Sequence, residues 1–133
     1  MTTTSDTALQ AKGLTPGFTV NDLAQSITFY EGLGFAVETR WESDGVLHGV
    51  MLQAGSARIG LSQDDWKKGK NRVKGVAMRI WLGTTQDIDG LARRAKEHGI
   101  TLAREAHDTE WGSRAFEVVD PDGFVLTISS DTT

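Results

Sequence analysis

The sequence predicts an α+β fold made of two β-α-β-β-β modules, a prediction that rests on a repeated helix and the strands around it. Residues 22–33 show helical spacing of apolar side chains between Asp22, a good N-cap, and Gly34, which can end a helix in the left-handed conformation. The same number of residues separates Asp87 from Gly99 around a second helical pattern. An internal repeat of about sixty residues therefore organises the chain.

The first module is expected over about residues 12–63. The apolar face of its helix consists of Leu23, Ile27, Tyr30 and Leu33. Its strands are expected over residues 11–20, 35–42, 46–54 and 57–63. In the last of these strands, Ile59 and Leu61 point to one side, so Arg58 and Gly60 should point to the other.

Residues 64–74 form a linker that is rich in lysine and arginine. Such a run could hold an anionic ligand, but we favour a solvated linker whose charge Asp64 and Asp65 partly offset, because charge runs are usually solvated. Trp66 is less easily explained. A large aromatic side chain in a polar linker must either fold back onto the protein or line a site.

The second module is expected over about residues 75–130. Its strands are predicted over residues 75–82, 100–107, 112–119 and 124–130. Val76 and Met78 should share one face of the first of these strands. We interpret Trp81 as a core residue because it alternates with apolar neighbours. In the last strand, Thr127 should lie on the concave side, away from the helix.

Three stretches give the sequence a resemblance to a known family: NDLAQSITFYEGLGF, DIDGLARRAKEHGI and RAFEVVDPDGFVLTIS. Over residues 12–130 the chain resembles the vicinal oxygen chelate superfamily of glyoxalases, bleomycin-resistance proteins and extradiol dioxygenases. Among these it is most similar to the metal-free, bleomycin-resistance-like members. The resemblance implies one domain over residues 1–133, with two curved sheets around a cleft and the helices outside. It also implies a homodimer.

Enzymes of this superfamily usually hold a divalent metal through the first and last strands of each module. The resemblance places the four ligand positions at Thr15, Gly60, Val76 or Met78, and Thr127. None of these side chains can replace imidazole or carboxylate at a divalent site. The three histidines, His48, His98 and His107, show no ligand spacing either. We therefore expect no metal and no other cofactor.

The cleft implied by the resemblance offers candidate binding residues. Trp41 and Trp111 lie among polar residues at similar places in the two modules and could stack on a flat ligand, or they could simply be packed. Arg58 and Arg114 could add polar contacts or be surface residues, and His48 could be a core or cavity-wall histidine. The full set of expected ligand-binding residues is Trp41, Trp111, His48, Arg58, Trp66, Arg114, Thr15, Gly60, Met78 and Thr127.

Composition limits the possible partners. The chain has 133 residues, a formal net charge of −4 and no cysteine. The acidic balance argues against nucleic acid, and no apolar run approaches the ~20 residues that a membrane span requires. The N-terminal residues lack the basic start and apolar core of a signal peptide. A cytoplasmic location is therefore the expectation.

Two functions remain open from the sequence. The first is a metal-free protein that binds an apolar or aromatic small molecule, such as an aromatic natural product or antibiotic, and sequesters it. The alternative is a glyoxalase-like lyase, isomerase or dioxygenase relative that works without the usual metal, with His48, Glu110 or Glu117 moving protons. No catalytic motif in the sequence supports the second function, so we lean towards a protein that is not an enzyme.

Overall fold

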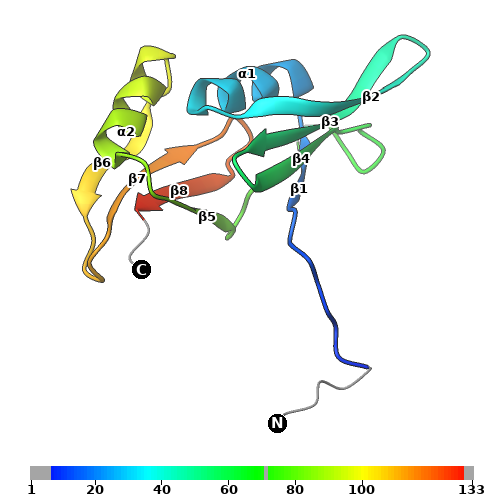
Figure 1. Ribbon diagram of the computed structural model, residues 1–133. Helices are drawn as coiled ribbons and strands as arrows, with labels where there is room; N and C mark the ends of the chain where they lie inside the picture. Colours follow the sequence, from blue (N-terminus) through cyan, green and yellow to red (C-terminus); the bar gives the residue numbers. More distant parts are fainter. Residues whose placement is uncertain (1–6, 71, 131–133) are drawn as a thin grey trace.

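The computed structural model describes residues 7–70 and 72–130, which form two four-stranded sheets and two helices (Figure 1). The first sheet has the order β1-β4-β3-β2 and contains β1 (Gly17–Val20), β2 (Ala36–Ser43), β3 (Val46–Ala54) and β4 (Ala57–Gln63). β1 pairs with β4 in parallel, and the other two pairings are antiparallel. The expected β-α-β-β-β connectivity of the first module is therefore confirmed.

The second sheet repeats this topology in the order β5-β8-β7-β6. Its strands are β5 (Arg79–Thr84), β6 (Leu102–Asp108), β7 (Arg114–Val119) and β8 (Val125–Ser130). β5 pairs with β8 in parallel, as β1 does with β4. The turn before β8 is closed by the Asp120 side chain, which accepts hydrogen bonds from the backbone N–H groups of Asp122 and Phe124, both at 2.9 Å.

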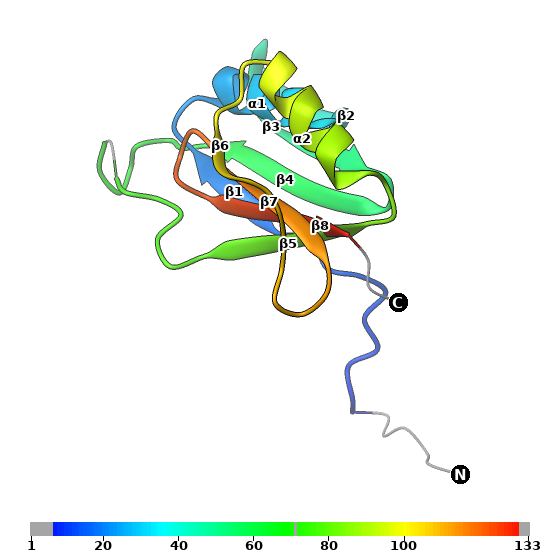
Figure 2. The same ribbon diagram turned by 90° about the vertical axis from the view of Figure 1, so that its left-hand side faces the viewer.

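The two helices begin and end where capping predicts. Asp22 caps α1 (Leu23–Leu33) by accepting a hydrogen bond from the Gln25 N–H, and the helix ends at Gly34 with a φ of 115°. Asp87 caps α2 (Ile88–Glu97) in the same way. Both helices lie on the same side of the molecule and contact each other, as Figures 1 and 2 show. No described helix has the length and apolarity needed to cross a membrane.

One hydrophobic core joins the two modules. It includes residues from both helices and from the helix-bearing faces of both sheets. Phe18 of β1 stacks on Phe124 beside β8, with ring centroids 4.0 Å apart. The Tyr30 hydroxyl of α1 donates a 2.7 Å hydrogen bond to Asp120, and both residues are buried. Burial raises the pKa of Asp120 above its usual value.

The first strand of each module begins later than predicted. Residues 11–16 lie outside β1, so Thr15 precedes the strand and is exposed. β5 begins at Arg79 rather than at residue 75, because Gly75 and Ala77 both have positive φ values that interrupt an extended strand. The alternation expected for Val76 and Met78 is therefore wrong. These side chains are 71% and 41% exposed.

The two ends of the linker are joined at Asp64, and Lys74 also donates to Asn21 Oδ1 of the first module at 2.6 Å. The Asp64 carboxylate is buried, and it accepts from Lys74 at 2.9 Å and from Arg72 at 3.0 Å. These interactions, with the Lys74 contact the largest, lower the pKa of Asp64 to about 2. Trp66 lies beside them, with the Lys74 Nζ 5.6 Å from its ring centroid.

Candidate functional site

The helix-free face of the first sheet carries one large aromatic side chain, Trp41 of β2. Trp41 is paired with Gly49 of β3 and is 48% exposed. Its ring lies over this glycine, since a Cβ added to Gly49 would be 3.4 Å from Trp41 Cε3 and 2.8 Å from the Leu61 carbonyl oxygen. Because Gly49 has no side chain, the indole can lie against the sheet at this position. The exposed surface of Trp41 remains available to another molecule.

Arg58 and Gly60 of β4 lie on this same helix-free face, as the alternation of the strand predicts. Ile59 and Leu61 are buried in the core on the other side. Arg58 is not free, because its guanidinium forms an ion pair with Glu38 of β2 at 2.9 Å. This hydrogen-bonded pair lowers the pKa of Glu38 and raises that of Arg58.

The helix-free face of the second sheet holds a cluster that we call the indole cluster, defined by Arg79, Trp81, Trp111, Glu117 and Thr127. The Trp81 and Trp111 rings meet edge to face with centroids 5.9 Å apart. The Arg79 guanidinium lies 5.7 Å from the Trp81 ring centroid. It also donates to the Thr127 hydroxyl at 2.7 Å and pairs with Glu117 at 2.9 Å. A cation and two indoles are therefore held in one arrangement.

The indole cluster leaves much apolar surface in contact with water. Trp81 is 55% exposed and Trp111 is 61% exposed, although each could have been packed into a core. Thr127 beneath them is buried. Edge-to-face aromatic and cation–π contacts hold the rings without covering them. The cluster can therefore present an ordered aromatic surface to a flat ligand.

The expected ligand positions do not fit a divalent metal. Gly60 and Thr127 face the helix-free side, whereas Thr15 and Met78 lie just outside the strands. Glu117 is the carboxylate nearest to Thr127, and it is already paired with Arg79. Over residues 7–70 and 72–130, no group of three or more histidine, aspartate or glutamate residues could hold a metal ion. We therefore derive no metal-dependent step.

The structure separates several residues that the sequence analysis grouped together. Trp41 lies in β2 of the first sheet, whereas Trp111 lies in the turn between β6 and β7, and the ring contact of Trp111 is with Trp81. Arg114 lies on the helix-bearing side, where it pairs with Asp89 of α2 at 2.7 Å. The same pairing raises the pKa of Arg114 and lowers that of Asp89. Of the two alternatives left open for Arg114, the structure thus favours a residue outside the face that carries Trp41.

Two further expectations about individual side chains are also corrected. His48 is exposed, which excludes the core alternative, although Val50 and Leu52, which have the same parity along β3, belong to the core. Trp81 was expected in the core and is instead exposed on the helix-free face. Ile80 and Leu82 pack against the core, so strand alternation places Trp81 on the opposite side.

The sequence analysis missed Arg79 and Trp81, and it considered Glu117 only as a proton donor or acceptor. The signal that could have found the first two is the alternation of Arg79, Trp81 and Gly83 with the apolar Ile80 and Leu82. That alternation places Arg79 and Trp81 opposite Ile80 whether the strand begins at residue 75 or at Arg79.

Comparison with known proteins assigns the family. The model of the Glyoxalase/Bleomycin resistance protein/Dioxygenase superfamily matches residues 14–128. The chain belongs to this superfamily. Its two-module fold agrees with that assignment. A comparison with functionally curated proteins gave no match.

Several solved structures share the fold, among them a member of the same superfamily. A member from Sphaerobacter thermophilus is 24% identical with a TM-score of 0.72, and the match covers 92% of this chain and 98% of that one. A bleomycin-binding protein solved in complex with bleomycin is 23% identical with a TM-score of 0.66, covering 91% and 99%. TioX from Micromonospora is 14% identical with a TM-score of 0.70, covering 92% and 98%. At these identities the likeness shows the fold.

Proposed function

We propose that this protein binds an apolar or aromatic small molecule on its helix-free faces, without a metal, and sequesters it. The observation that carries the proposal is the exposed Trp81–Trp111 pair, held in place by Arg79. Relatives in the same superfamily include a protein solved with bleomycin bound, which supports this class of function. The lack of cysteine fits a reducing compartment such as the cytoplasm.

The physical basis is the transfer of indole surface out of water. Each aromatic side chain can bury 150–250 Å² in total, and stacked aromatic pairs gain about 0.5–1.5 kcal/mol beyond area burial. About half of each indole residue is still exposed in the free protein, so a planar ligand would bury that surface. Arg79 lies at the edge of the same surface and provides a cation against which a polar edge of the ligand can be placed.

The chemistry of the site favours binding over catalysis. Within the indole cluster, the polar groups beside the two rings are the Thr127 hydroxyl and Glu117, which is ion-paired with Arg79. A general base must be able to reach and accept a substrate proton, and a carboxylate held in an ion pair is poorly placed for that role. The polar groups of this face are therefore suited to orienting a ligand.

We include a homodimer in the proposal. Trp41 and the indole cluster belong to different modules, and within the described residues Trp41 makes no ring contact with Trp81 or Trp111. A ligand enclosed by both surfaces would need a second chain to bring them together. Exposed apolar side chains on the helix-free faces would also be covered in a pair that buries about 800 Å² per partner. Light scattering at micromolar concentration should exceed the 14.5 kDa of one chain, and a value equal to it would contradict the dimer.

Fluorescence titration tests the binding proposal. We would titrate the protein with metal-free bleomycin and with a panel of planar aromatic natural products, and follow tryptophan emission. We expect saturable quenching by at least one compound and a loss of affinity of about tenfold or more in Trp111→Ala, because one lost aromatic contact and its buried area exceed 1.4 kcal/mol. Trp66→Ala is the comparison variant, since Trp66, although among the residues expected from the sequence, lies beside Lys74 in the linker and outside the indole cluster.

The titration has two outcomes that would contradict the proposal. One is the absence of saturable binding across the panel. The other is equal weakening by Trp111→Ala and Trp66→Ala, which would place the ligand away from the indole cluster.

A further inference from the structure

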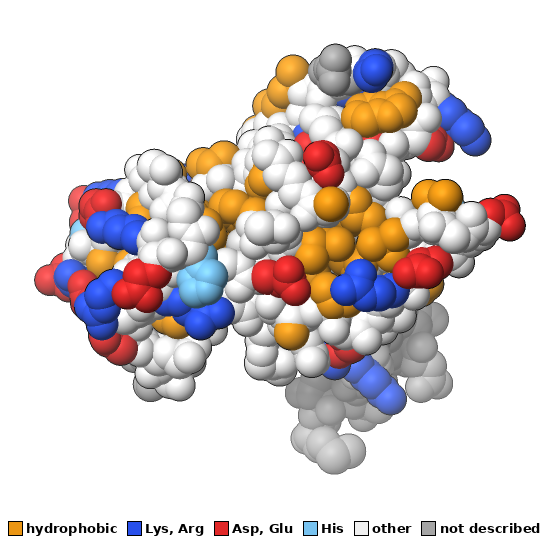
Figure 3. Space-filling view, turned by 90° about the horizontal axis from the view of Figure 1, so that it is seen from above, with side chains coloured by type: hydrophobic (Ala, Val, Ile, Leu, Met, Phe, Trp, Pro, Cys, Tyr) orange, Lys and Arg blue, Asp and Glu red, His pale blue; other side chains and the backbone are white. Residues whose placement is uncertain are grey.

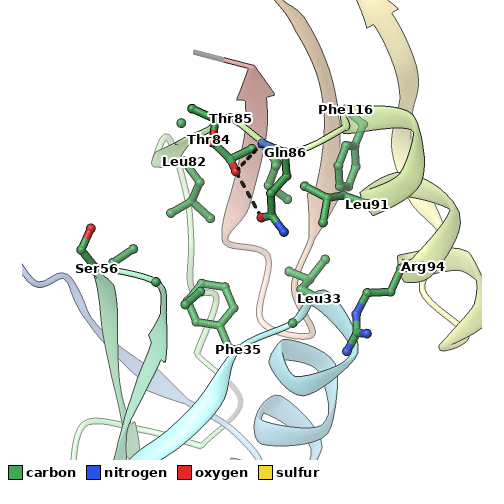
Figure 4. Close-up of a pocket in the computed structure, with 16 residues that line it drawn as sticks. Leu33, Phe35, Ser56, Leu82, Thr84, Thr85, Gln86, Leu91, Arg94 and Phe116 are labelled. Atoms are coloured by element: carbon green, nitrogen blue, oxygen red, sulfur yellow. Dashed lines mark hydrogen bonds between the residues drawn. The ribbon is translucent and has the colours of Figure 1, made fainter.

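A groove lies between the two modules on the helix-bearing side of the second sheet, opposite to the indole cluster. Its volume is about 680 Å³. It is lined by the junction of α1 and β2, the turn between β3 and β4, the end of β5 with the loop that follows, and one face of α2 (Figure 4). A groove of this volume is within the usual range for a small-molecule site.

The part of the groove nearest to the hydrophobic core is apolar. Phe35, Phe116 and Ile128 belong to the hydrophobic core, and Leu82 and Leu91 are partly buried beside them. Figure 4 shows the labelled leucine and phenylalanine side chains approaching the groove from both modules. Figure 3 views the molecule from above. Hydrophobic side chains are also exposed there, where the left-hand part of the molecule, the side of α2 and β6, adjoins the rest. The groove thus gives access to the joint core of the two modules.

The rim of the groove is polar and carries one cation. Arg94 of α2 reaches across to α1, with its Nε 3.9 Å from where a Gly34 Cβ would lie. Within the described residues, no ion pair or side-chain hydrogen bond involves its guanidinium. Gln86 is held by Thr84, whose hydroxyl donates to Gln86 Oε1 at 3.2 Å and accepts from the Gln86 N–H at 3.1 Å. The Gln86 amide NH₂ therefore remains available as a donor.

Arg94 differs from the other arginines that line a candidate site. Arg58, Arg79 and Arg114 each form an ion pair with a carboxylate at 2.7–3.0 Å. Arg94 carries five donors in a planar fork that matches a carboxylate, yet no protein carboxylate occupies it in the described part of the chain. An arginine at the rim of an apolar groove fits a ligand that brings its own carboxylate.

We propose that this groove binds an amphipathic carboxylate, with the apolar body against Phe35, Leu82 and Phe116 and the carboxylate at Arg94. The site is independent of the proposed function, because Leu82, Phe116 and Ile128 alternate along their strands with residues that face the other side of the sheet. Binding here leaves the indole cluster uncovered. A failure to detect binding at one of the two sites therefore does not count against binding at the other.

The test uses decanoate as the probe and isothermal titration calorimetry below its critical micelle concentration. We expect saturable binding of decanoate and at least tenfold weaker binding of decylammonium, which has the same chain and the opposite charge. Arg94→Gln should weaken decanoate binding about tenfold or more, because a hydrogen-bonded contact with a charged group is lost. Arg93→Gln is the matched control, since it removes the same charge from the neighbouring residue, which does not line this groove.

Two more variants keep the result unambiguous. Thr85→Trp should fill the groove from its exposed rim and abolish decanoate binding while the melting temperature stays close to that of the wild type. Trp111→Ala should leave decanoate binding unchanged.

The proposal is overturned by an absence of binding, by equal effects of Arg94→Gln and Arg93→Gln, by a loss of binding in Trp111→Ala, or by a Thr85→Trp variant that stays folded and binds normally. A change of oligomeric state in Thr85→Trp would also overturn it, because a second chain would then be the occupant.

Discussion

Replacing Tyr30 with phenylalanine should weaken the interaction between the two modules. Tyr30 is fully buried on α1, and its hydroxyl donates to Asp120 Oδ2 at 2.7 Å across 90 residues of sequence. The ring also makes edge contacts with Phe29 and Phe35, at centroid distances of 5.2 and 5.5 Å, and phenylalanine preserves these. The substitution therefore removes one buried hydrogen bond and little else.

The magnitude follows from the charge of the acceptor. Asp120 accepts three hydrogen bonds from two backbone N–H groups and one hydroxyl, an arrangement that suits the ionised carboxylate. A hydrogen bond to a charged group contributes about 1.5–3 kcal/mol, and removing the donor leaves a buried oxygen unpaired. We therefore expect Tyr30→Phe to lower the free energy of unfolding by about 2 kcal/mol at pH 7.5.

The effect should depend on pH in a defined direction. The pKa of Asp120 is raised in the folded protein by burial, so this carboxyl stabilises the fold most below its unfolded pKa and progressively less as the pH rises through its folded pKa. Loss of the Tyr30 donor raises the folded pKa further. The difference in stability between the wild type and the variant should therefore increase from pH 4 to pH 7.5.

Urea denaturation at fixed protein concentration measures this difference. We expect the midpoint to fall in Tyr30→Phe with an unchanged m-value, and to fall more at pH 7.5 than at pH 4. A double-mutant cycle with Asp120→Asn should show coupling between the two positions. A loss below about 0.5 kcal/mol at pH 7.5, or a loss that is the same at both values of pH, would refute the reasoning.

Two further predictions concern the linker and the turn that follows it. Lys74→Met should lower the urea midpoint at neutral pH, because Asp64 loses its shortest ion pair. The pKa of Asp64 is lowered to about 2, so this stabilisation is present above its unfolded pKa and is lost as the pH falls towards 2. A stability difference between the wild type and Lys74→Met that increased on acidification would contradict the assignment. Gly75→Ala should lower the melting temperature severely, since its Cβ would lie 2.4 Å from the carbonyl carbon of Gly123. Gly112→Ala also has a positive φ but meets open space, so equal effects of the two variants would disprove the steric explanation.

Much of the fold could be predicted because its signals are local. The caps at Asp22 and Asp87 and the glycine at Gly34 define helix ends by backbone geometry alone. Strands β3 and β4 fall where hydrophobic alternation places them. Family membership followed from motifs at the helix starts and at the turn before β8, and the family match over residues 14–128 confirms it.

The candidate site was predicted less well because it depends on register and on partners distant in sequence. Ala77 adopts a left-handed conformation that is unusual for alanine and cannot be predicted from the residue type. This conformation delays the start of β5 to Arg79. Trp81 faces the helix-free side because Ile80 and Leu82 pack against the core, and the apolar character of Trp81 alone does not indicate this. The ion pair between Arg114 and Asp89 joins a strand to a helix 25 residues away, and single-sequence periodicity gives no information about such a contact.

The role of the exposed indole rings is the central claim, and paired melting and titration of Trp41→Ala and Trp111→Ala test it most directly. Both rings are about half exposed, so we expect the melting temperature to change little, while the affinity for the best ligand of the fluorescence panel falls about tenfold or more. If both variants lost several kcal/mol of stability while the folded fraction bound the ligand normally, the tryptophans would be structural and the binding site would lie elsewhere.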